Sequence, residues 1–294
     1  MVKEAFRDNI GLRKDNLLLL DKINNILEDY LRQGYRLTLR QLYYQLVSKG
    51  IIPNKASAYA KISSLMVKGR MAGYVDWDAI EDRLRRIRLP YWVTGISDAI
   101  EDTINQYRLD RMQGQDNYIE VWCEKDALSN VLYRITHKYH IPLMVNRGYS
   151  SCTAMHDAYN RFLRCLEEDK VPYILYLGDH DPSGLDMLRD IKERLSEFGI
   201  PLLNIIHVAI TEEQIKKYNP PPNYAKVKDP RAKWYIQKYG HTSWEVDALN
   251  PKILHSLLED NIKLLIDEKK YLDVIRQEEE DKQKLRDLVN NGGI

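Results

Sequence analysis

The sequence lacks long apolar runs and contains few cysteines. It has no uninterrupted stretch of about eighteen apolar residues, so no transmembrane helix is expected. The first residues, MVKEAFRDNIGLRKDN, contain no apolar segment of the kind found in secretory signals. The three cysteines, Cys123, Cys152 and Cys165, are too few and too scattered for a disulfide framework or a zinc knuckle. We therefore expect a soluble protein of the reducing cytoplasm, with no membrane partner.

The net charge is close to zero, but the charges are unevenly distributed along the chain. The formal charge of the 294 residues is +1. Residues 1–95 contain 17 Lys and Arg against 10 Asp and Glu, whereas the remaining residues contain 27 against 33. A basic first part followed by an acidic second part suggests that any polyanion meets the first part.

Residues 1–95 show helical periodicity and are expected to bind DNA. Apolar residues recur at helical spacing over 15–35 and again after Thr38, which can cap a helix, and a third helical segment spans 56–72. A short extended segment, YVDW at 74–77, follows. This outline is typical of a winged-helix domain, although a helical bundle with a solvated basic face has the same pattern. The expected phosphate contacts are Lys68, Arg70, Arg83, Arg85, Arg86 and Arg88.

Beyond a polar connector at 96–116, the pattern changes to alternating strands and helices. The strand-like segments are YIEVWCE, PLMVNRG, VPYILYLGD and PLLNIIHVAI, and helix-like segments separate them. Such alternation predicts a mostly parallel sheet flanked by helices over 117–294, where the chain ends in a charged helical extension. The expected fold class is therefore mixed α/β, with a helical domain at 1–95 followed by this sheet domain.

Three carboxylates follow the predicted strands. Glu124 ends the first strand, and Asp179 and Asp181 follow the third. Ligand sites of such sheets lie at the carboxyl ends of the strands, and like charges placed together are costly unless a cation lies between them. Carboxylate oxygens suit Mg²⁺, so we expect Glu124, Asp179 and Asp181 to bind Mg²⁺, with Mn²⁺ as a substitute. The alternative is that Asp181, before Pro182, caps a helix.

Four motifs occur in a fixed order along the chain: TLRQLYY, EVWCEKDAL, RGYSS and GDHDPSG. Together they resemble the A subunit of topoisomerase VI and the related meiotic double-strand-break transesterase, over roughly residues 36–200. The likeness is greatest to the short, stand-alone bacterial, plasmid and phage relatives of that subunit. It implies a winged-helix domain that carries a nucleophilic tyrosine, followed by a TOPRIM domain that holds Mg²⁺.

The resemblance implies roles for individual residues. Tyr44 is the nucleophile, Arg40 contacts the scissile phosphate, and Glu124 carries the metal or acts as general acid or base. Arg40 and Tyr44 are four residues apart and share a helix face. A phenol with a pKa near 10 requires a base or a positive charge to become a nucleophile, and arginine binds phosphate in a bidentate manner. Tyr43 is the alternative nucleophile, and either tyrosine could instead pack in the core.

The expected function is a Mg²⁺-dependent, DNA-cleaving transesterase that leaves Tyr44 joined to a 5′ phosphate. The resemblance implies a homodimer on double-stranded DNA in which each active site is built in trans, in a nucleoid-associated, cytoplasmic setting. Strand passage would require a separate ATPase or regulatory subunit. Two alternatives stay open: a metal-dependent TOPRIM nuclease in which water attacks, and a non-catalytic DNA-binding or scaffolding subunit.

A later motif, GHTSWEVDAL, is interpreted as structural. Thr242 and Glu245 have the spacing of a capping box. We therefore expect a helix to begin there rather than a second site.

Overall fold

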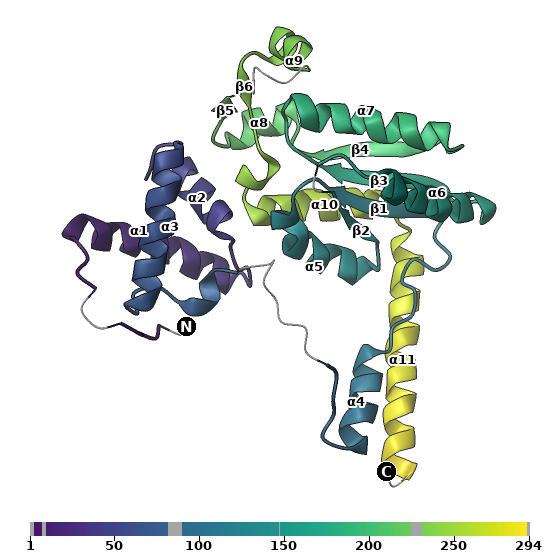
Figure 1. Cartoon of the computed structure of the whole chain (residues 1–294). Coiled ribbons are helices and arrows are strands. Elements are labelled where there is room, and N and C mark those ends of the chain that lie inside the picture. Colours follow the sequence, from purple (N-terminus) through teal and green to yellow (C-terminus); the bar gives the residue numbers. More distant parts are fainter. Residues whose placement is uncertain (1–2, 8–9, 82–89, 147, 225–230, 293–294) are drawn as a thin grey trace.

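The computed structural model describes residues 3–7, 10–81, 90–146, 148–224 and 231–292 (Figure 1). The described chain has three regions. The N-terminal part covers residues 3–81, the sheet part covers 107–267, and the arm consists of the helices α4 (Ile96–Gln106) and α11 (Glu268–Gly292). Figure 1 shows the N-terminal part beside the sheet part and the arm projecting away from both.

The N-terminal part is built from three helices, as the periodicity predicts. They are α1 (Lys14–Arg32), α2 (Leu39–Ser48) and α3 (Ala56–Met71), followed by the 3₁₀ turn η1 (Trp77–Ala79). Thr38 begins α2 with a capping box, because its side chain accepts from the Gln41 N–H and the Gln41 side chain accepts from the Thr38 N–H. The apolar faces of α1, α2 and α3 form one core that includes Leu20, Leu42 and Leu65.

The prediction of an extended segment at 74–77 is wrong. These residues turn and lead into η1, because the side chain of Asp76 accepts from the N–H of Asp78. Within the described residues of the N-terminal part, extended pairing is limited to isolated bridges, one of which joins Leu37 to Ile80. Four of the expected DNA contacts lie outside the described residues: Arg83, Arg85, Arg86 and Arg88.

The sheet part contains a parallel four-stranded sheet, which confirms the mixed α/β prediction. Its strands are β1 (Asn117–Cys123), β2 (Leu143–Val145), β3 (Val171–Leu177) and β4 (Asn204–Ala209). Their order is β2-β1-β3-β4, and every neighbouring pair is parallel. The carboxyl ends of the two central strands, β1 and β3, therefore lie side by side.

Helices cover both faces of the sheet (Figure 1). The helices are α5 (Ser129–Tyr139) and α10 (Pro251–Leu265) on one face, and α6 (Cys152–Glu167) and α7 (Pro182–Glu197) on the other. Successive strand residues point to opposite faces, so Val121 and Leu175 pack toward α5 and α10. Trp122 and Tyr176 pack toward α6 and α7. This double burial explains why the strands are almost continuously apolar.

Smaller elements lie beyond β4. They are α8 (Glu212–Tyr218), α9 (Ala232–Tyr239), the antiparallel strands β5 (Asn223–Tyr224) and β6 (Thr242–Ser243), and the 3₁₀ turn η3 (Val246–Ala248). The prediction that a helix begins at Thr242 is therefore wrong. His180 and Trp244 exchange two backbone hydrogen bonds, with N···O distances of 2.8 and 3.1 Å, and this pairing keeps the segment extended. Glu245 then leads into η3 instead of closing a capping box.

The arm consists of α4 (Ile96–Gln106) and α11 (Glu268–Gly292), which lie side by side (Figure 1). The connector expected at 96–116 is therefore helical in its first half. The apolar residues of α4 are spaced to make one side of a helix, and Ile104 is buried. Within the described ranges, neither α11 nor any other helix is long and apolar enough to cross a membrane.

Candidate active site

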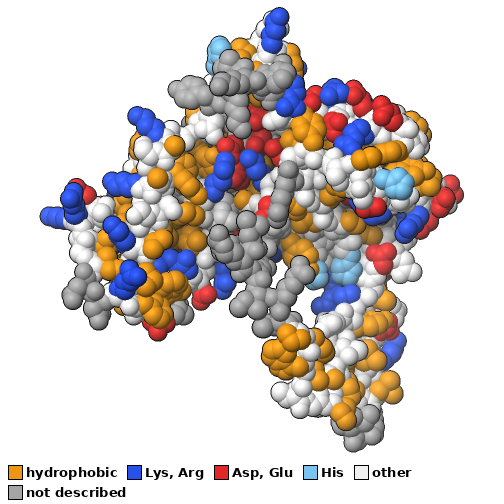
Figure 2. Space-filling model, viewed as in Figure 1, with side chains coloured by type: hydrophobic (Ala, Val, Ile, Leu, Met, Phe, Trp, Pro, Cys, Tyr) orange, Lys and Arg blue, Asp and Glu red, His pale blue; other side chains and the backbone are white. Residues whose placement is uncertain are grey.

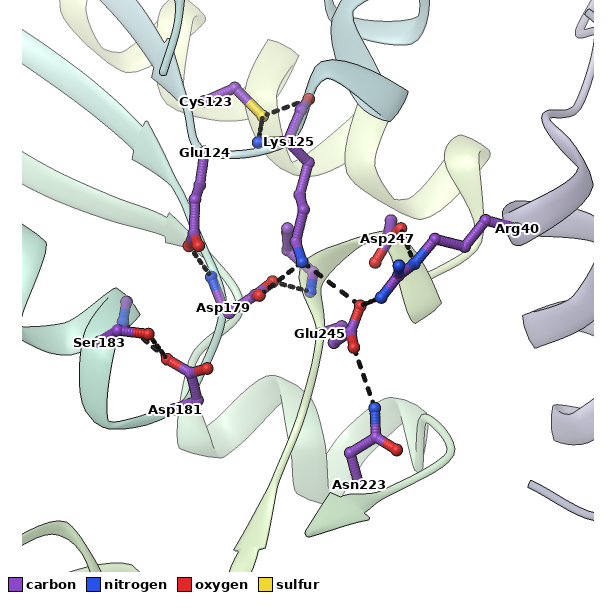
Figure 3. A network of polar contacts seen from close by, with 12 residues as sticks. Arg40, Cys123, Glu124, Lys125, Asp179, Asp181, Ser183, Asn223, Glu245 and Asp247 are labelled. Atoms are coloured by element: carbon purple, nitrogen blue, oxygen red, sulfur yellow. Dashed lines mark hydrogen bonds and ion pairs between the residues drawn. The ribbon is translucent and has the colours of Figure 1, made fainter. Parts of the chain in front are cut away.

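The ends of β1 and β3 bring two of the expected carboxylates together. Cys123 and Leu177, the last residues of these strands, are in register. Glu124 follows Cys123, and Asp179 follows Leu177 after one glycine. The backbone N–H of Asp179 donates to Oε2 of Glu124 over 3.0 Å (Figure 3). Glu124 and Asp179 therefore meet at one edge of the sheet, as the sequence predicts.

Asp181 caps a helix. Its Oδ1 accepts from the Ser183 hydroxyl at 2.9 Å and from the Gly184 N–H at 2.7 Å, which makes it the N-cap of α7. Its charge still acts on the site. Burial raises the pKa of Glu124, and the negative charges of Asp179 and Asp181 raise it further.

Gly184 permits the close approach of α7 to the loop that carries Asp179. A Cβ atom at this position would lie 2.2 Å from the backbone oxygen of Asp179. We expect Gly184→Ala to lower the free energy of unfolding by about 2 kcal/mol or more, because the backbone must move to relieve the clash. Urea denaturation measures the change, with Gly95→Ala as control, since a Cβ atom there meets no other atom within 4 Å. Equal stability of the two variants would contradict this packing.

Lys125 neutralises Asp179. Asp179 is 4% exposed, and its Oδ2 lies 2.7 Å from Nζ of Lys125 while its Oδ1 accepts from the Val246 N–H at 2.9 Å. Burial raises the pKa of Asp179, and the ammonium of Lys125 opposes that effect. Sequence reasoning missed Lys125, although it directly follows Glu124 in the motif EVWCEKDAL.

Two further carboxylates, Glu245 and Asp247, face Lys125 and Arg40 from the segment before α10 (Figure 3). Asp247 is 1% exposed, and neither of its carboxylate oxygens has a hydrogen-bond partner, although Nε of Arg40 lies 3.4 Å from Oδ2. Burial raises the pKa of Asp247. These residues were missed because the segment resembled a helix start. The available signal was their spacing, two residues apart, which is also that of Asp179 and Asp181.

Arg40 and Tyr44 reach these carboxylates from α2. Nη2 of Arg40 lies 3.4 Å from the Tyr44 hydroxyl, and the same guanidinium donates to Glu245. Tyr44 is 4% exposed and packs against Ala248 of η3. Burial raises its pKa above the ordinary range, and the charge of Glu245 adds to this effect. A single chain thus places the expected nucleophile and its arginine beside the acidic groups of its own sheet part.

Tyr43 is oriented differently. Its hydroxyl donates to Oδ1 of Asn54 at 2.9 Å, and its ring packs edge-on against Tyr59. Both contacts lie within the N-terminal part, where Tyr59 is exposed and Asn54 also donates to the Pro222 carbonyl of the sheet part. The geometry therefore favours Tyr44 over Tyr43 as the residue beside the charged groups.

The structure describes two of the residues expected to bind DNA, Lys68 and Arg70, and they differ in their exposure to solvent. Lys68 is exposed near the end of α3. Arg70 is half-buried; it donates to the Trp77 carbonyl at 2.6 Å and stacks 4.5 Å from the Trp77 ring centroid. Arg70 therefore serves the internal packing of the N-terminal part. Figure 2 shows basic side chains spread over this part, and acidic and basic side chains gathered where it meets the sheet part.

The donor chemistry of the strand ends suits Mg²⁺. The described residues contain no group of three or more His, Cys, Asp or Glu side chains arranged to hold a metal ion. However, burial raises the pKa of Glu124, and the negative charges of Asp179 and Asp181 raise it further, so a cation would relieve the cost of its ionisation. Carboxylate oxygens are also the ligands that Mg²⁺ prefers. The residues that would hold it are Glu124, Asp179 and Asp181.

Comparisons of the chain with protein-family models, with curated proteins and with solved structures found no match. Interpretation of the site therefore depends on its own geometry. That geometry joins a tyrosine and an arginine from one part of the chain to a lysine and several carboxylates from the other.

Proposed function

We propose that the protein is a Mg²⁺-dependent, DNA-cleaving transesterase of the topoisomerase VI A-subunit type, with a winged-helix N-terminal part and a TOPRIM sheet part. The observation that carries the proposal is the position of Arg40, which contacts both Tyr44 and the carboxylates Glu245 and Asp247. Cleavage of a phosphodiester by a tyrosine requires a phenol, a positive charge for the phosphate and groups that manage protons or a metal. All of these occur within this one cluster.

Each residue has a definite task in the proposed reaction. Arg40 binds the scissile phosphate, and Tyr44 Oη attacks the phosphorus, so that the 3′ oxygen leaves and Tyr44 becomes joined to the 5′ phosphate. Mg²⁺, when bound, would stabilise negative charge on the phosphate. Glu124 acts either as a ligand of Mg²⁺ or as the acid that protonates the departing oxygen, and its raised pKa suits the second task.

The proposal includes double-stranded DNA as the substrate and a homodimer that cuts both strands. On the N-terminal part, the exposed side chain of Lys68 would contact the DNA phosphates. Strand passage would need a separate ATPase subunit. The resemblance to the topoisomerase VI A subunit implies sites shared between two chains. The contacts of Arg40 with both Tyr44 and Glu245 support a site built within one chain instead.

The proposal is tested by incubating the protein with supercoiled plasmid and Mg²⁺ or Mn²⁺, followed by rapid denaturation. We expect nicked and linear DNA that carries covalently bound protein, and we expect chelation of the metal with EDTA to prevent its formation. Glu124→Gln should form far less of this complex. DNA breaks with free ends would indicate the nuclease, and DNA binding without any cleavage would indicate a binding subunit.

A further inference from the structure

We infer that Glu245 is a further catalytic residue, the carboxylate that accepts the proton of Tyr44 within the same chain. The inference rests on the proposed function, because it assigns Glu245 a role in the same reaction. Glu245 lies between β6 and η3, in a segment to which neither the expected metal ligands nor the expected nucleophile belong. Its side chain is 19% exposed, so it is largely shielded yet still reachable.

Donors from separate parts of the chain hold this carboxylate in place (Figure 3). Oε1 accepts from Nδ2 of Asn223 at 3.0 Å, and Oε2 lies 3.3 Å from Nζ of Lys125. Nη2 of Arg40 donates to Oε2 and also lies 3.4 Å from the Tyr44 hydroxyl, so the carboxylate and the phenol share one nitrogen of the guanidinium. The carboxylate is therefore fixed beside the phenol by contacts from α2, from β5 and from the end of β1.

The phenol needs an acceptor at this position. Burial raises the pKa of Tyr44, so the hydroxyl stays protonated until the phosphorus is attacked, and the proton must leave as the new bond forms. The hydroxyl contacts Nη2 of Arg40, and Glu245 is the carboxylate bound to that same nitrogen. A guanidinium has donors only and cannot take a proton. Glu245 is therefore the group placed to receive it.

Arrival of DNA changes the balance of charge around Glu245. Burial opposes ionisation of Glu245, but Lys125 and Arg40 outweigh burial and lower its pKa, so without DNA the carboxylate is a weak base. The scissile phosphate competes with Glu245 for Arg40, because a guanidinium forms bidentate pairs with phosphate as well as with carboxylate. Once Arg40 turns to the phosphate, Glu245 keeps Lys125 and Asn223 and faces Tyr44 with one cation fewer. Asp247, the other buried carboxylate near Arg40, then adds to the negative field around Glu245.

In the chemical step, the proton of Tyr44 moves to a Glu245 oxygen while Tyr44 Oη forms a bond to phosphorus. The bond between phosphorus and the 3′ oxygen breaks, its electron pair leaves with that oxygen, and the oxygen takes a proton from water. Reversal of the step returns the proton from Glu245 to Tyr44 and reseals the strand.

The test compares Glu245→Gln with Glu259→Gln. Glu259 is a matched control, because its side chain has the same 19% exposure and, like Glu245, accepts from a lysine, here Lys138, and from Tyr139 as well. We expect Glu245→Gln to slow formation of the covalent complex by about 10²-fold or more at neutral pH. The difference in rate between parent and variant should become smaller as pH rises, because hydroxide then takes the proton in place of the carboxylate. Glu259→Gln should react at the parent rate.

Two further variants separate catalysis from structure. Glu245→Asp keeps a carboxylate and should recover part of the rate with the pH profile of the parent, whereas a purely structural role for Glu245 predicts the same loss at every pH. Mixing Tyr44→Phe chains with Glu245→Gln chains tests the arrangement. If both residues act in one chain, the mixture stays inactive, and restored cleavage would overturn the same-chain assignment.

The outcomes distinguish this inference from the proposed function. If the parent forms the covalent complex and Glu245→Gln forms it at the parent rate, the role of Glu245 is wrong and the proposed function stands. If the parent forms no covalent complex under any condition, both are wrong.

Discussion

Tyr44→Phe is expected to abolish covalent DNA cleavage while DNA binding and folding persist. The substitution removes only the hydroxyl that attacks phosphorus, and the ring continues to pack against Ala248. Loss of a nucleophile removes the chemical step itself, so we expect at least about a 10⁴-fold decrease in the rate of complex formation. Denaturing gels of protein-linked plasmid DNA measure the rate, and a gel-shift assay measures binding.

Tyr43→Phe is the control for this substitution. It removes the hydrogen bond to Asn54 and should lower the free energy of unfolding by about 1 kcal/mol, with cleavage retained. If Tyr43→Phe stops cleavage and Tyr44→Phe does not, the nucleophile is the neighbouring tyrosine. If both variants still cut DNA and the ends are free of protein, water is the nucleophile.

The second large effect concerns the attachment of the arm to the sheet part. The side chain of Glu278, on α11, is completely buried. Its Oε1 lies 3.0 Å from Nη2 of Arg111 and 2.8 Å from Nζ of Lys282. It also accepts from the backbone N–H of Leu109 at 3.1 Å. Glu278→Gln removes the buried counter-charge of Arg111 and Lys282, although Lys282 keeps its pairing with Glu279 at 3.0 Å, so we expect the free energy of unfolding to fall by about 3 kcal/mol. Glu280→Gln, an exposed position on the same helix, should change it little.

The effect of Glu278 should depend on pH. Burial opposes its ionisation, but Arg111 and Lys282 outweigh burial and lower its pKa from 4.5 to about 2. Because the folded pKa lies below the unfolded value, the stabilisation is complete above that unfolded value and disappears as pH falls toward about 2. Urea denaturation should therefore show a large difference between parent and Glu278→Gln at neutral pH and a small one near pH 2. A difference of the same size at both pH values would contradict the assignment.

The sheet could be predicted because its signals are local. Each strand is a short apolar run between helical segments, and burial on both faces is what makes these runs continuous. The meeting of Glu124 and Asp179 followed from the same pattern, since the carboxyl ends of neighbouring parallel strands lie at one edge. Both inferences needed only the order of elements and a rule about where parallel strands end.

The other half of the site depends on contacts between distant residues. Glu245 had the local pattern of a capping box, but the backbone pairing of His180 with Trp244 holds its segment extended. Its partner Arg40 lies about two hundred residues earlier in the sequence, and the two meet because α2 packs against η3. Helix α4 was missed for a similar reason, because its apolar side is explained only by its packing against α11.

The most direct test of the proposed chemistry is to identify the residue that becomes joined to DNA. The parent protein is incubated with a short duplex and Mg²⁺, the complex is digested with nuclease and protease, and the peptides are examined by mass spectrometry. We predict a nucleotide attached through its 5′ phosphate to the peptide that contains Tyr44. Cleaved DNA with free 5′ ends and no modified tyrosine would contradict the covalent mechanism.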